Sequence, residues 1–251
     1  MNHKKFWITS AHRGFVEGDL KENCLAAYYN AFLRGAEMIE TDARLSKDGV
    51  FIVNHDDTVR GFNDKGEAVT YKVEETSSEV LRSVILSSDE KWGVQRVPTL
   101  EEVLNLAYHT GMYVNIDLKN GLKIAEGVSK LVLKCGMIGK VVYALNGSGM
   151  DGINTILSVD PDARFIDRGA GFAKTVKDFP ERSKRCFCYT WDTCRDDIDA
   201  IREYGCLLAL ISLDENNFKR SIEYHPDMCE YLHTSDFYAI EEEYLKSIKL
   251  Y

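Results

Sequence analysis

Glu40 and Asp42 are two carboxylates separated by one residue in the apolar run Met38–Asp42. Side chains two residues apart on a strand point to the same face. Two carboxylates on a buried face repel each other and lose hydration unless a cation compensates them. A hard divalent cation such as Mg²⁺ or Ca²⁺ would do so, with Asp117 as a third oxygen ligand. The alternative is a solvated pair, or a pair neutralised by Arg44.

Two histidines end neighbouring apolar runs on either side of this carboxylate pair. His12 follows the run Phe6–Ala11, and His55 closes the run Val50–His55. Imidazole gives or takes a proton near neutral pH, so two of them can divide the acid and base roles of a phosphodiester cleavage. A single histidine at a strand end is more often structural. Two that bracket paired carboxylates favour catalysis.

Arg13 and Lys119 are the basic side chains beside these residues in the sequence. An arginine fork matches phosphate oxygens, and lysine supplies a compact charge, so we expect both to contact phosphate. Either could instead neutralise Glu40 or Asp42. Trp191 ends another apolar run and could form a flat apolar wall for an alcohol, or belong to the core.

These residues need a scaffold that brings the ends of several strands to one rim. The sequence has eight apolar runs with strand character: Phe6–Ala11, Met38–Asp42, Val50–His55, Met112–Leu118, Val141–Leu145, Ala163–Ile166, Cys186–Trp191 and Leu207–Ser212. Glu230–Ser235 is an alternative for the eighth. Segments with helical spacing lie between most of them: Asn23–Arg34, Leu100–Tyr108, Leu122–Lys134, Gly152–Val159 and Arg195–Tyr204.

Strands that alternate with helices predict a parallel α/β sheet. The 251 residues match the length of an eight-stranded barrel, roughly 250 residues. We therefore predict a single (β/α)8 barrel domain over residues 1–251, with catalytic groups at the C-terminal ends of its strands. The polar stretch at about residues 56–98 is too long for one crossover, so we expect it to be an insertion after the third strand.

Charge and cysteine content limit the partners and the compartment. With 40 acidic and 31 basic residues the formal charge is -9, which disfavours nucleic acid and anionic membrane surfaces as partners. No stretch approaches the ~18 apolar residues of a membrane span, and the N-terminus lacks a signal core. Seven scattered cysteines indicate a reducing, cytoplasmic setting. An anionic substrate would need a locally positive site, which a divalent cation among carboxylates and one or two basic side chains could provide.

Six short motifs occur in one order over the first half of the chain. They are His12-Arg13-Gly14, Glu22-Asn23, the segment from Gly35 to Asp42, His55-Asp56, the segment from Pro98 to Glu102, and Asp117-Leu118-Lys119. In this order and spacing the chain resembles the glycerophosphodiester phosphodiesterase family, whose pattern is His-Arg-Gly, Glu-Asn, Gly-Ala-x-x-x-Glu-x-Asp, His-Asp, Pro-Thr-Leu-Glu-Glu and Glu-x-Lys.

The resemblance implies a barrel enzyme that uses one divalent cation to hydrolyse a glycerophosphodiester to an alcohol and glycerol phosphate. A substrate hydroxyl next to the phosphate would be the nucleophile and would give a cyclic intermediate that water opens. The implied metal ligands are Glu40, Asp42 and Asp117; the implied acid and base are His12 and His55; and the implied phosphate contacts are Arg13 and Lys119.

The chain departs from the family pattern at three places. The family's Trp-Thr-x-Asn appears only as Thr190-Trp191-Asp192-Thr193. Asp117 stands where the family usually has glutamate, and the closing Gly-x-Asp-Gly-Ile-x-Thr-Asp motif is missing. Two other functions fit the same residues. A phospholipase C- or D-like barrel would show an apolar rim for lipid, which the acidic charge disfavours. A non-catalytic barrel that binds a phosphorylated ligand would not need two proton-transfer groups.

Overall fold

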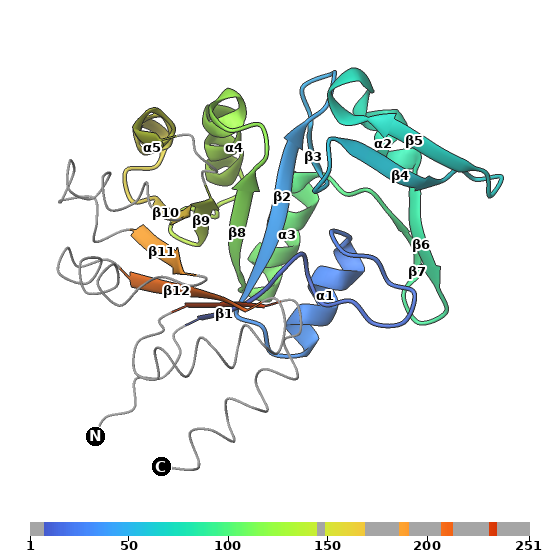
Figure 1. Ribbon diagram of the computed structural model, residues 1–251, viewed down its shortest axis with the longest axis horizontal. Coiled ribbons are helices and arrows are strands. Elements are labelled where there is room, and N and C mark those ends of the chain that lie inside the picture. Colours follow the sequence, from blue (N-terminus) through green and yellow to red (C-terminus); the bar gives the residue numbers. More distant parts are fainter. Residues whose placement is uncertain (1–7, 145–148, 169–185, 191–206, 213–230, 235–251) are drawn as a thin grey trace, which may run out of the picture.

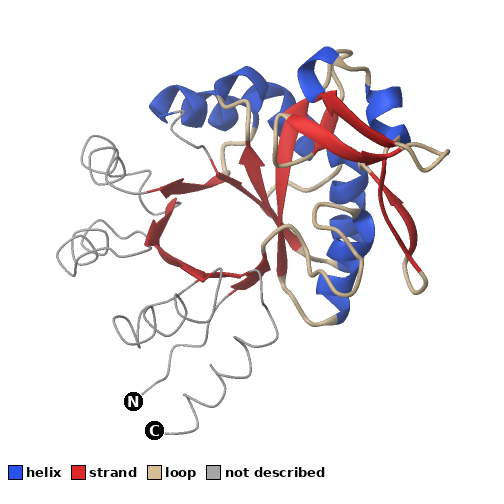
Figure 2. Cartoon of the chain, turned by 45° about the vertical axis from the view of Figure 1, so that its right-hand side comes forward, coloured by secondary structure: helices blue, strands red, loops and turns tan. Residues whose placement is uncertain are grey.

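Eight parallel strands form a ring in the computed structural model, which describes residues 8–144, 149–168, 186–190, 207–212 and 231–234. Figure 2 looks into this ring. In ring order the strands are β1 (Ile8–Ala11), β2 (Met38–Leu45), β8 (Tyr113–Leu118), β9 (Val141–Ala144), β10 (Arg164–Arg168), β11 (Cys186–Thr190), β12 (Leu207–Ser212) and β13 (Tyr231–Thr234).

The ring is closed by β1, which pairs in parallel with both β13 and β2. Ser10 is in register with His233 on one side and with Met38 on the other. Every neighbouring pair around the ring is parallel. The predicted (β/α)8 barrel is therefore confirmed. Both candidates for the eighth strand belong to it, since Leu207–Ser212 and the strand within Glu230–Ser235 lie side by side.

The prediction that Val50–His55 is a barrel strand is wrong. The strand there, β3 (Phe51–Val53), pairs antiparallel with the end of β2. A tight turn joins the two, with Gly49 at φ 80° and Ser46 bonded through its backbone N–H to the Val50 carbonyl. Asp48-Gly49 is a hairpin signal, and it marks a reversal of the chain that the apolar pattern alone does not show.

The stretch that we expected to be an insertion forms a small sheet beside the barrel and follows β3 (Figure 1). Its strands are β4 (Thr58–Phe62), β5 (Ala68–Lys72), β6 (Ile85–Asp89) and β7 (Gly93–Arg96), in the order β5-β4-β6-β7. A short 3₁₀ helix, η1 (Val73–Glu75), and α2 (Ser78–Ser83) accompany them. Val59, Leu81 and Val97 form a separate core here together with Ile52 of β3, which fixes the insertion to the barrel edge.

Helices α1 (Leu25–Leu33), α3 (Leu100–Thr110), α4 (Leu122–Lys134) and α5 (Gly149–Val159) lie outside the ring (Figure 1). Thr99 and Glu102 form a reciprocal capping box that starts α3. Ile39, Val114 and Ile116 alternate with the polar residues of β2 and β8 and join the core formed with α3 and α4. Consequently the carboxylates on these strands face the barrel interior. The predicted helix Arg195–Tyr204 lies outside the described residues.

Among the helices that the structure describes, none has the length and apolar character needed to cross a membrane.

Candidate active site

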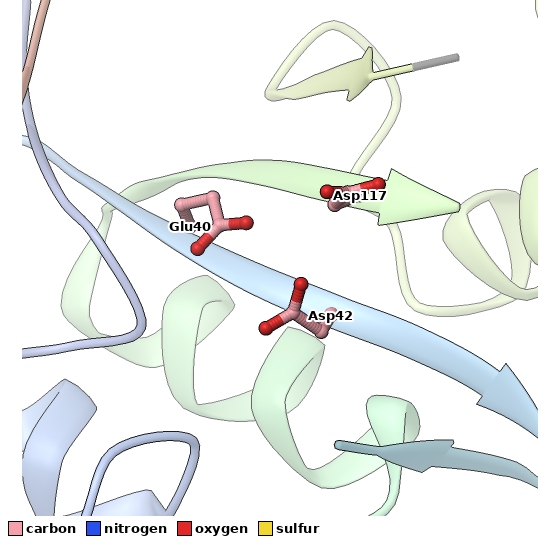
Figure 3. Close-up of side chains that lie close together, drawn as sticks. All are labelled: Glu40, Asp42 and Asp117. Atoms are coloured by element: carbon pink, nitrogen blue, oxygen red, sulfur yellow. The ribbon is translucent and has the colours of Figure 1, made fainter. Parts of the chain in front are cut away.

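Glu40, Asp42 and Asp117 form a cluster of three carboxylates, as the sequence predicts. Asp42 of β2 is in register with Asp117 of β8, and Glu40 lies one pleat earlier on β2. One oxygen of each carboxylate lies within 4.8 Å of an oxygen of the other two, and the residues are 0–3% exposed. Figure 3 shows the three side chains gathered over the two strands.

Burial makes this cluster electrostatically unfavourable without a cation. Desolvation raises the pKa of Glu40 well above its usual value, and the charges of Asp42 and Asp117 raise it further. Burial alone would also raise the pKa of Asp42. That effect is outweighed by Lys119, by a hydrogen bond from Asn23 and by Arg13, which together lower it. The cluster therefore holds more negative charge than its neighbours neutralise.

Lys119 and Arg13 are the basic side chains in contact with the cluster in the described part of the chain. Lys119 Nζ lies 2.7 Å from Asp117 Oδ2 and 3.0 Å from Asp42 Oδ1. Arg13 Nε lies 3.3 Å from Asp42 Oδ2. Both side chains thus neutralise carboxylates, which is the alternative role that the sequence left open for them. Arg44 does not, because its guanidinium donates to the His55 carbonyl.

The loop after β1 closes over Glu40. Arg13 has a left-handed backbone with φ 56°, and its N–H donates to Glu40 Oε2 at 3.1 Å. Gly14 follows at φ 85°, where an added Cβ would lie 2.7 Å from the Ala27 carbonyl carbon in α1. A larger residue at Gly14 would push the loop away from α1. The His-Arg-Gly motif therefore places the backbone N–H and the guanidinium of Arg13 next to the carboxylates.

Two residues of this site had no assigned role in the sequence prediction. Asn23 Nδ2 donates to Asp42 Oδ2 at 2.8 Å, and Glu22 Oε1 accepts from Arg13 Nη1 at 2.8 Å. Their signal was the Glu-Asn motif just before α1. The motif alone could not show which side chains it contacts, because Arg13 lies in the loop after β1 and Asp42 lies on β2.

The two predicted histidines lie in different environments. Burial and the nearby Arg13 charge lower the pKa of His12 to about 4, so its imidazole is neutral at pH 7. His55 has a side chain 40% exposed, and its Nδ1 lies 2.9 Å from Asp56 Oδ1. Because an ionised carboxylate can only accept, Nδ1 carries a proton and Nε2 remains for exchange.

A pocket of about 400 Å³ opens beside the carboxylate cluster. Its walls include Arg13 and Asn23, which touch the cluster, and His55, Lys21 and Arg60. The structure thus brings His12, Arg13, Glu40, Asp42, His55, Asp117 and Lys119 to one end of the barrel. Trp191 lies outside the described residues.

Known proteins are similar to this chain in sequence and in fold. Residues 12–164 match the sequence pattern of the glycerophosphoryl diester phosphodiesterase family, a range that contains all seven of these residues. The chain belongs to this family. It is 35% identical over 128 residues to a glycerophosphodiester phosphodiesterase of Caldanaerobacter subterraneus subsp. tengcongensis, which covers 51% of each protein. A glycerophosphodiester phosphodiesterase of Bacillus altitudinis is 37% identical over 124 residues, 49% of each.

This chain thus spans about half the length of the curated family members it matches. Solved structures of the family cover nearly all of its fold. A Parabacteroides distasonis glycerophosphoryl diester phosphodiesterase superimposes with a TM-score of 0.74 at 20% identity, over 99% of this chain and 88% of the other. An Oleispira antarctica phosphodiesterase, solved with the product sn-glycerol-3-phosphate, has a TM-score of 0.74 at 15% identity over 96% of each chain. At these identities the likeness establishes the shared barrel.

Proposed function

We propose that the protein is a metal-dependent phosphoric diester hydrolase that cleaves a glycerophosphodiester into an alcohol and glycerol phosphate. The observation that carries the proposal is the buried cluster of Glu40, Asp42 and Asp117, with two histidines at the same end of the barrel, in a chain of this family. The glycerol phosphate bound to the Oleispira antarctica phosphodiesterase indicates which product such a site would release.

The three carboxylates fit one divalent cation. Oxygens that bind the same Ca²⁺ lie at most about 5 Å apart, and those on Mg²⁺ somewhat closer, so the cluster has suitable spacing. The raised pKa of Glu40 indicates that Lys119 and Arg13 do not compensate all of its charge. Glu40, Asp42 and Asp117 would therefore be the protein ligands. When bound, the cation would polarise the phosphoryl group and stabilise its developing charge.

His12 is suited to be the base and His55 the acid. His12 stays unprotonated well below pH 7, so it can take the proton from the substrate hydroxyl that attacks phosphorus. His55 donates Nδ1–H to Asp56, whose carboxylate would stabilise an imidazolium that protonates the leaving alcohol. In the second step His55 takes a proton from the water that opens the cyclic phosphate, and His12 returns its proton to the substrate oxygen that leaves phosphorus.

Arg13 and Lys119 have donors left over after binding the carboxylates. An ammonium has three N–H groups, and Lys119 uses two on Asp42 and Asp117. The remaining groups of both side chains would hold phosphate oxygens. Trp191 would serve as an apolar wall for the alcohol.

We infer a single domain over residues 1–251 and a cytoplasmic setting. The free thiols of Cys24 and Cys135 in the described part of the chain support a reducing environment.

A turnover assay on purified protein tests the hydrolase. Glycerophosphodiesters with different alcohols are offered before and after chelation, and Mg²⁺, Ca²⁺ or Zn²⁺ is then added back. We expect activity to disappear with chelator and to return with Mg²⁺ or Ca²⁺. Activity restored by Zn²⁺ alone would rule out an all-oxygen site. Turnover of phospholipid vesicles but not of free diesters would instead indicate a phospholipase, and binding without turnover a non-catalytic barrel.

Histidine variants test the chemistry in the same assay. His12→Ala and His55→Ala should each lower kcat by about 10²–10⁴, as loss of a general acid or base does. His109→Ala is the control, because His109 lies exposed at the end of α3 with Nδ1 near the Asn105 carbonyl. Near-parental turnover in either site variant would remove that histidine from the mechanism.

A further inference from the structure

The pocket beside the carboxylates lies between a loop of the barrel and a segment that leads into the inserted sheet. One wall is the loop that runs from Arg13 to Asn23, and the other is formed by residues 54–60 with Leu86 of the inserted sheet. Its volume of about 400 Å³ is in the range of small-molecule sites, about 300–1,000 Å³. Arg13 and Asn23 belong both to this pocket and to the contacts of Asp42. When the phosphate of a substrate is held at the carboxylates, the group attached to that phosphate can therefore extend into the pocket.

The charges of this pocket do not cancel. Glu22 is paired with Arg13 at 2.8 Å, and Asp56 with His55 and Arg60 at 2.9 and 3.2 Å. The wall thus carries three basic side chains, Arg13, Lys21 and Arg60, against two acidic ones, and Arg60 shares Asp56 with His55. Lys21 is exposed, and its ammonium has no ion-pair partner among the described residues. Once a divalent cation neutralises the carboxylates beside the pocket, its wall therefore carries a surplus of positive charge.

The lining is also unsuited to a quaternary ammonium group. Such groups are held against the faces of aromatic rings. Among the described residues that line the pocket none is Phe, Tyr or Trp, and Leu86 is the apolar one. Lys21 and Arg60 would repel a cationic alcohol and attract an anionic one.

We propose that this pocket is a subsite for the alcohol half of the diester, and that Lys21 and Arg60 select alcohols that carry a negative charge over cationic ones. This inference rests on the proposed hydrolase function. The catalytic groups act on the phosphate that every glycerophosphodiester shares. Lys21 and Arg60 contact the alcohol, which is the part in which the substrates differ.

Three substrates of matched linkage test the selection: glycerophosphocholine, glycerophosphoglycerol and glycerophosphoinositol 4-phosphate, whose alcohols are cationic, neutral and anionic. For the parent protein with its cation we expect kcat/KM to be highest for the anionic substrate and lowest for choline. Lys21→Glu and Arg60→Glu should each lower kcat/KM for the anionic substrate about three- to tenfold and raise it for choline by a similar factor, mainly through KM.

Two controls separate this effect from a general loss of activity. The neutral substrate should change less than about twofold, and added salt should shrink the charge effects because the side chains are exposed. Lys65→Glu makes the same charge change on an exposed lysine that does not line the pocket. It should leave the relative kcat/KM values of the three substrates as in the parent. Melting temperatures check that every variant is folded.

The outcomes distinguish failure of the alcohol subsite from failure of the hydrolase function. If the parent hydrolyses all three substrates and neither Lys21→Glu nor Arg60→Glu changes their ratios, the subsite is refuted while the hydrolase stands. Equal effects of Lys65→Glu would also refute it, because they would come from net charge. If no diester is hydrolysed with any cation, both proposals fail together.

Discussion

Asn23 Nδ2 donates a hydrogen bond of 2.8 Å to Asp42 Oδ2, joining the loop before α1 to the barrel interior. Asn23 has φ 56°, a left-handed conformation that asparagine adopts more readily than most residues. Its Oδ1 accepts from the Tyr28 hydroxyl at 2.7 Å, and that hydroxyl also lies 2.8 Å from Thr41 Oγ1. Tyr28 is fully buried. The tyrosine therefore fixes the amide of Asn23 and, through it, the orientation of Asp42.

Tyr28→Phe tests this positioning chain. The phenyl ring keeps the packing, but Asn23 Oδ1 loses its donor in a buried place, which should lower the free energy of unfolding by about 1–3 kcal/mol. Asp42 would then be held less firmly, and we expect the affinity for Ca²⁺ or Mg²⁺ to fall about three- to tenfold. Calorimetric titration of the ion into chelated protein measures this without turnover.

Tyr29→Phe is the matched control for Tyr28→Phe. Tyr29 is the next residue of α1, is 42% exposed, and should bind the ion as the parent does. Unchanged ion affinity in Tyr28→Phe would show that Asp42 does not depend on this chain of hydrogen bonds.

The convergence of the carboxylates could be predicted from the sequence because it needs only strand periodicity and parallel pairing. Glu40 and Asp42 share a face by spacing, and a parallel neighbour places Asp117 opposite Asp42. The role of Asn23 could not be predicted in the same way. It depends on a left-handed loop residue that meets Asp42 from 19 positions away, and no period encodes such a contact.

The antiparallel course of β3 shows another limit of the sequence. The alternation of Val50–His55 predicts a strand but is the same for either pairing direction, and the direction was set by the Asp48-Gly49 turn. His55 nevertheless reaches the site, since Asn54 N–H bonds to the Asp42 carbonyl and keeps the end of β3 beside β2. His55 therefore lies at the predicted end of the barrel although the strand topology predicted for it was wrong.

Glu40→Gln should stabilise the protein without its cation. Burial and the neighbouring carboxylates raise the pKa of Glu40, so its ionisation opposes folding, and this cost grows as pH rises above about 4.5. Glutamine removes the charge and can still accept from Arg13 N–H through its carbonyl. We expect a melting temperature a few degrees higher in chelator at pH 7, measured by calorimetry, and little further rise when Ca²⁺ or Mg²⁺ is added.

Glu126→Gln provides the comparison for Glu40→Gln. Glu126 is exposed on α4 and paired with Lys130, so its variant should keep the full ion-induced rise in melting temperature. A lower melting temperature of Glu40→Gln in chelator would mean that Arg13 and Lys119 already neutralise the cluster.

The lowered pKa of His12 makes a prediction about stability and pH. An unfolded histidine titrates near pH 6.5, whereas His12 in the folded protein titrates at about 4. Between these values the unfolded chain binds more protons, so folding stability falls as pH drops from 6.5 to 4. His12→Asn lacks this contribution. The stability of the parent relative to His12→Asn should therefore decrease over that window, by on the order of 2 kcal/mol.

Chemical denaturation in chelator at several pH values measures the difference between parent and His12→Asn. His109→Asn serves as the comparison for the loss of an imidazole, since His109 is exposed at the end of α3. A difference for His12→Asn that does not change with pH would show that His12 titrates alike in the folded and unfolded chains.

Asp117 stands where the family usually has glutamate, and it tests the ligand set most directly. Its Oδ2 lies 2.7 Å from Lys119 Nζ, and the side chain is 1% exposed. Asp117→Asn removes one charge at nearly constant shape, so we expect the ion concentration for half-maximal activity to rise tenfold or more. Asp117→Glu restores the family's length and should keep ion-dependent turnover, with a changed preference between Mg²⁺ and Ca²⁺ because the smaller ion tolerates less misfit.

Titrations of activity and of binding heat against each ion distinguish these outcomes for Asp117. Asp151→Asn, an exposed aspartate in the first turn of α5, controls for the change in net charge and should behave as the parent. If Asp117→Asn binds the ion and turns over like the parent, Asp117 is not a ligand. The Asp117 carboxylate would then serve only as the ion-pair partner of Lys119. The ion would be held by Glu40 and Asp42 with groups outside this cluster.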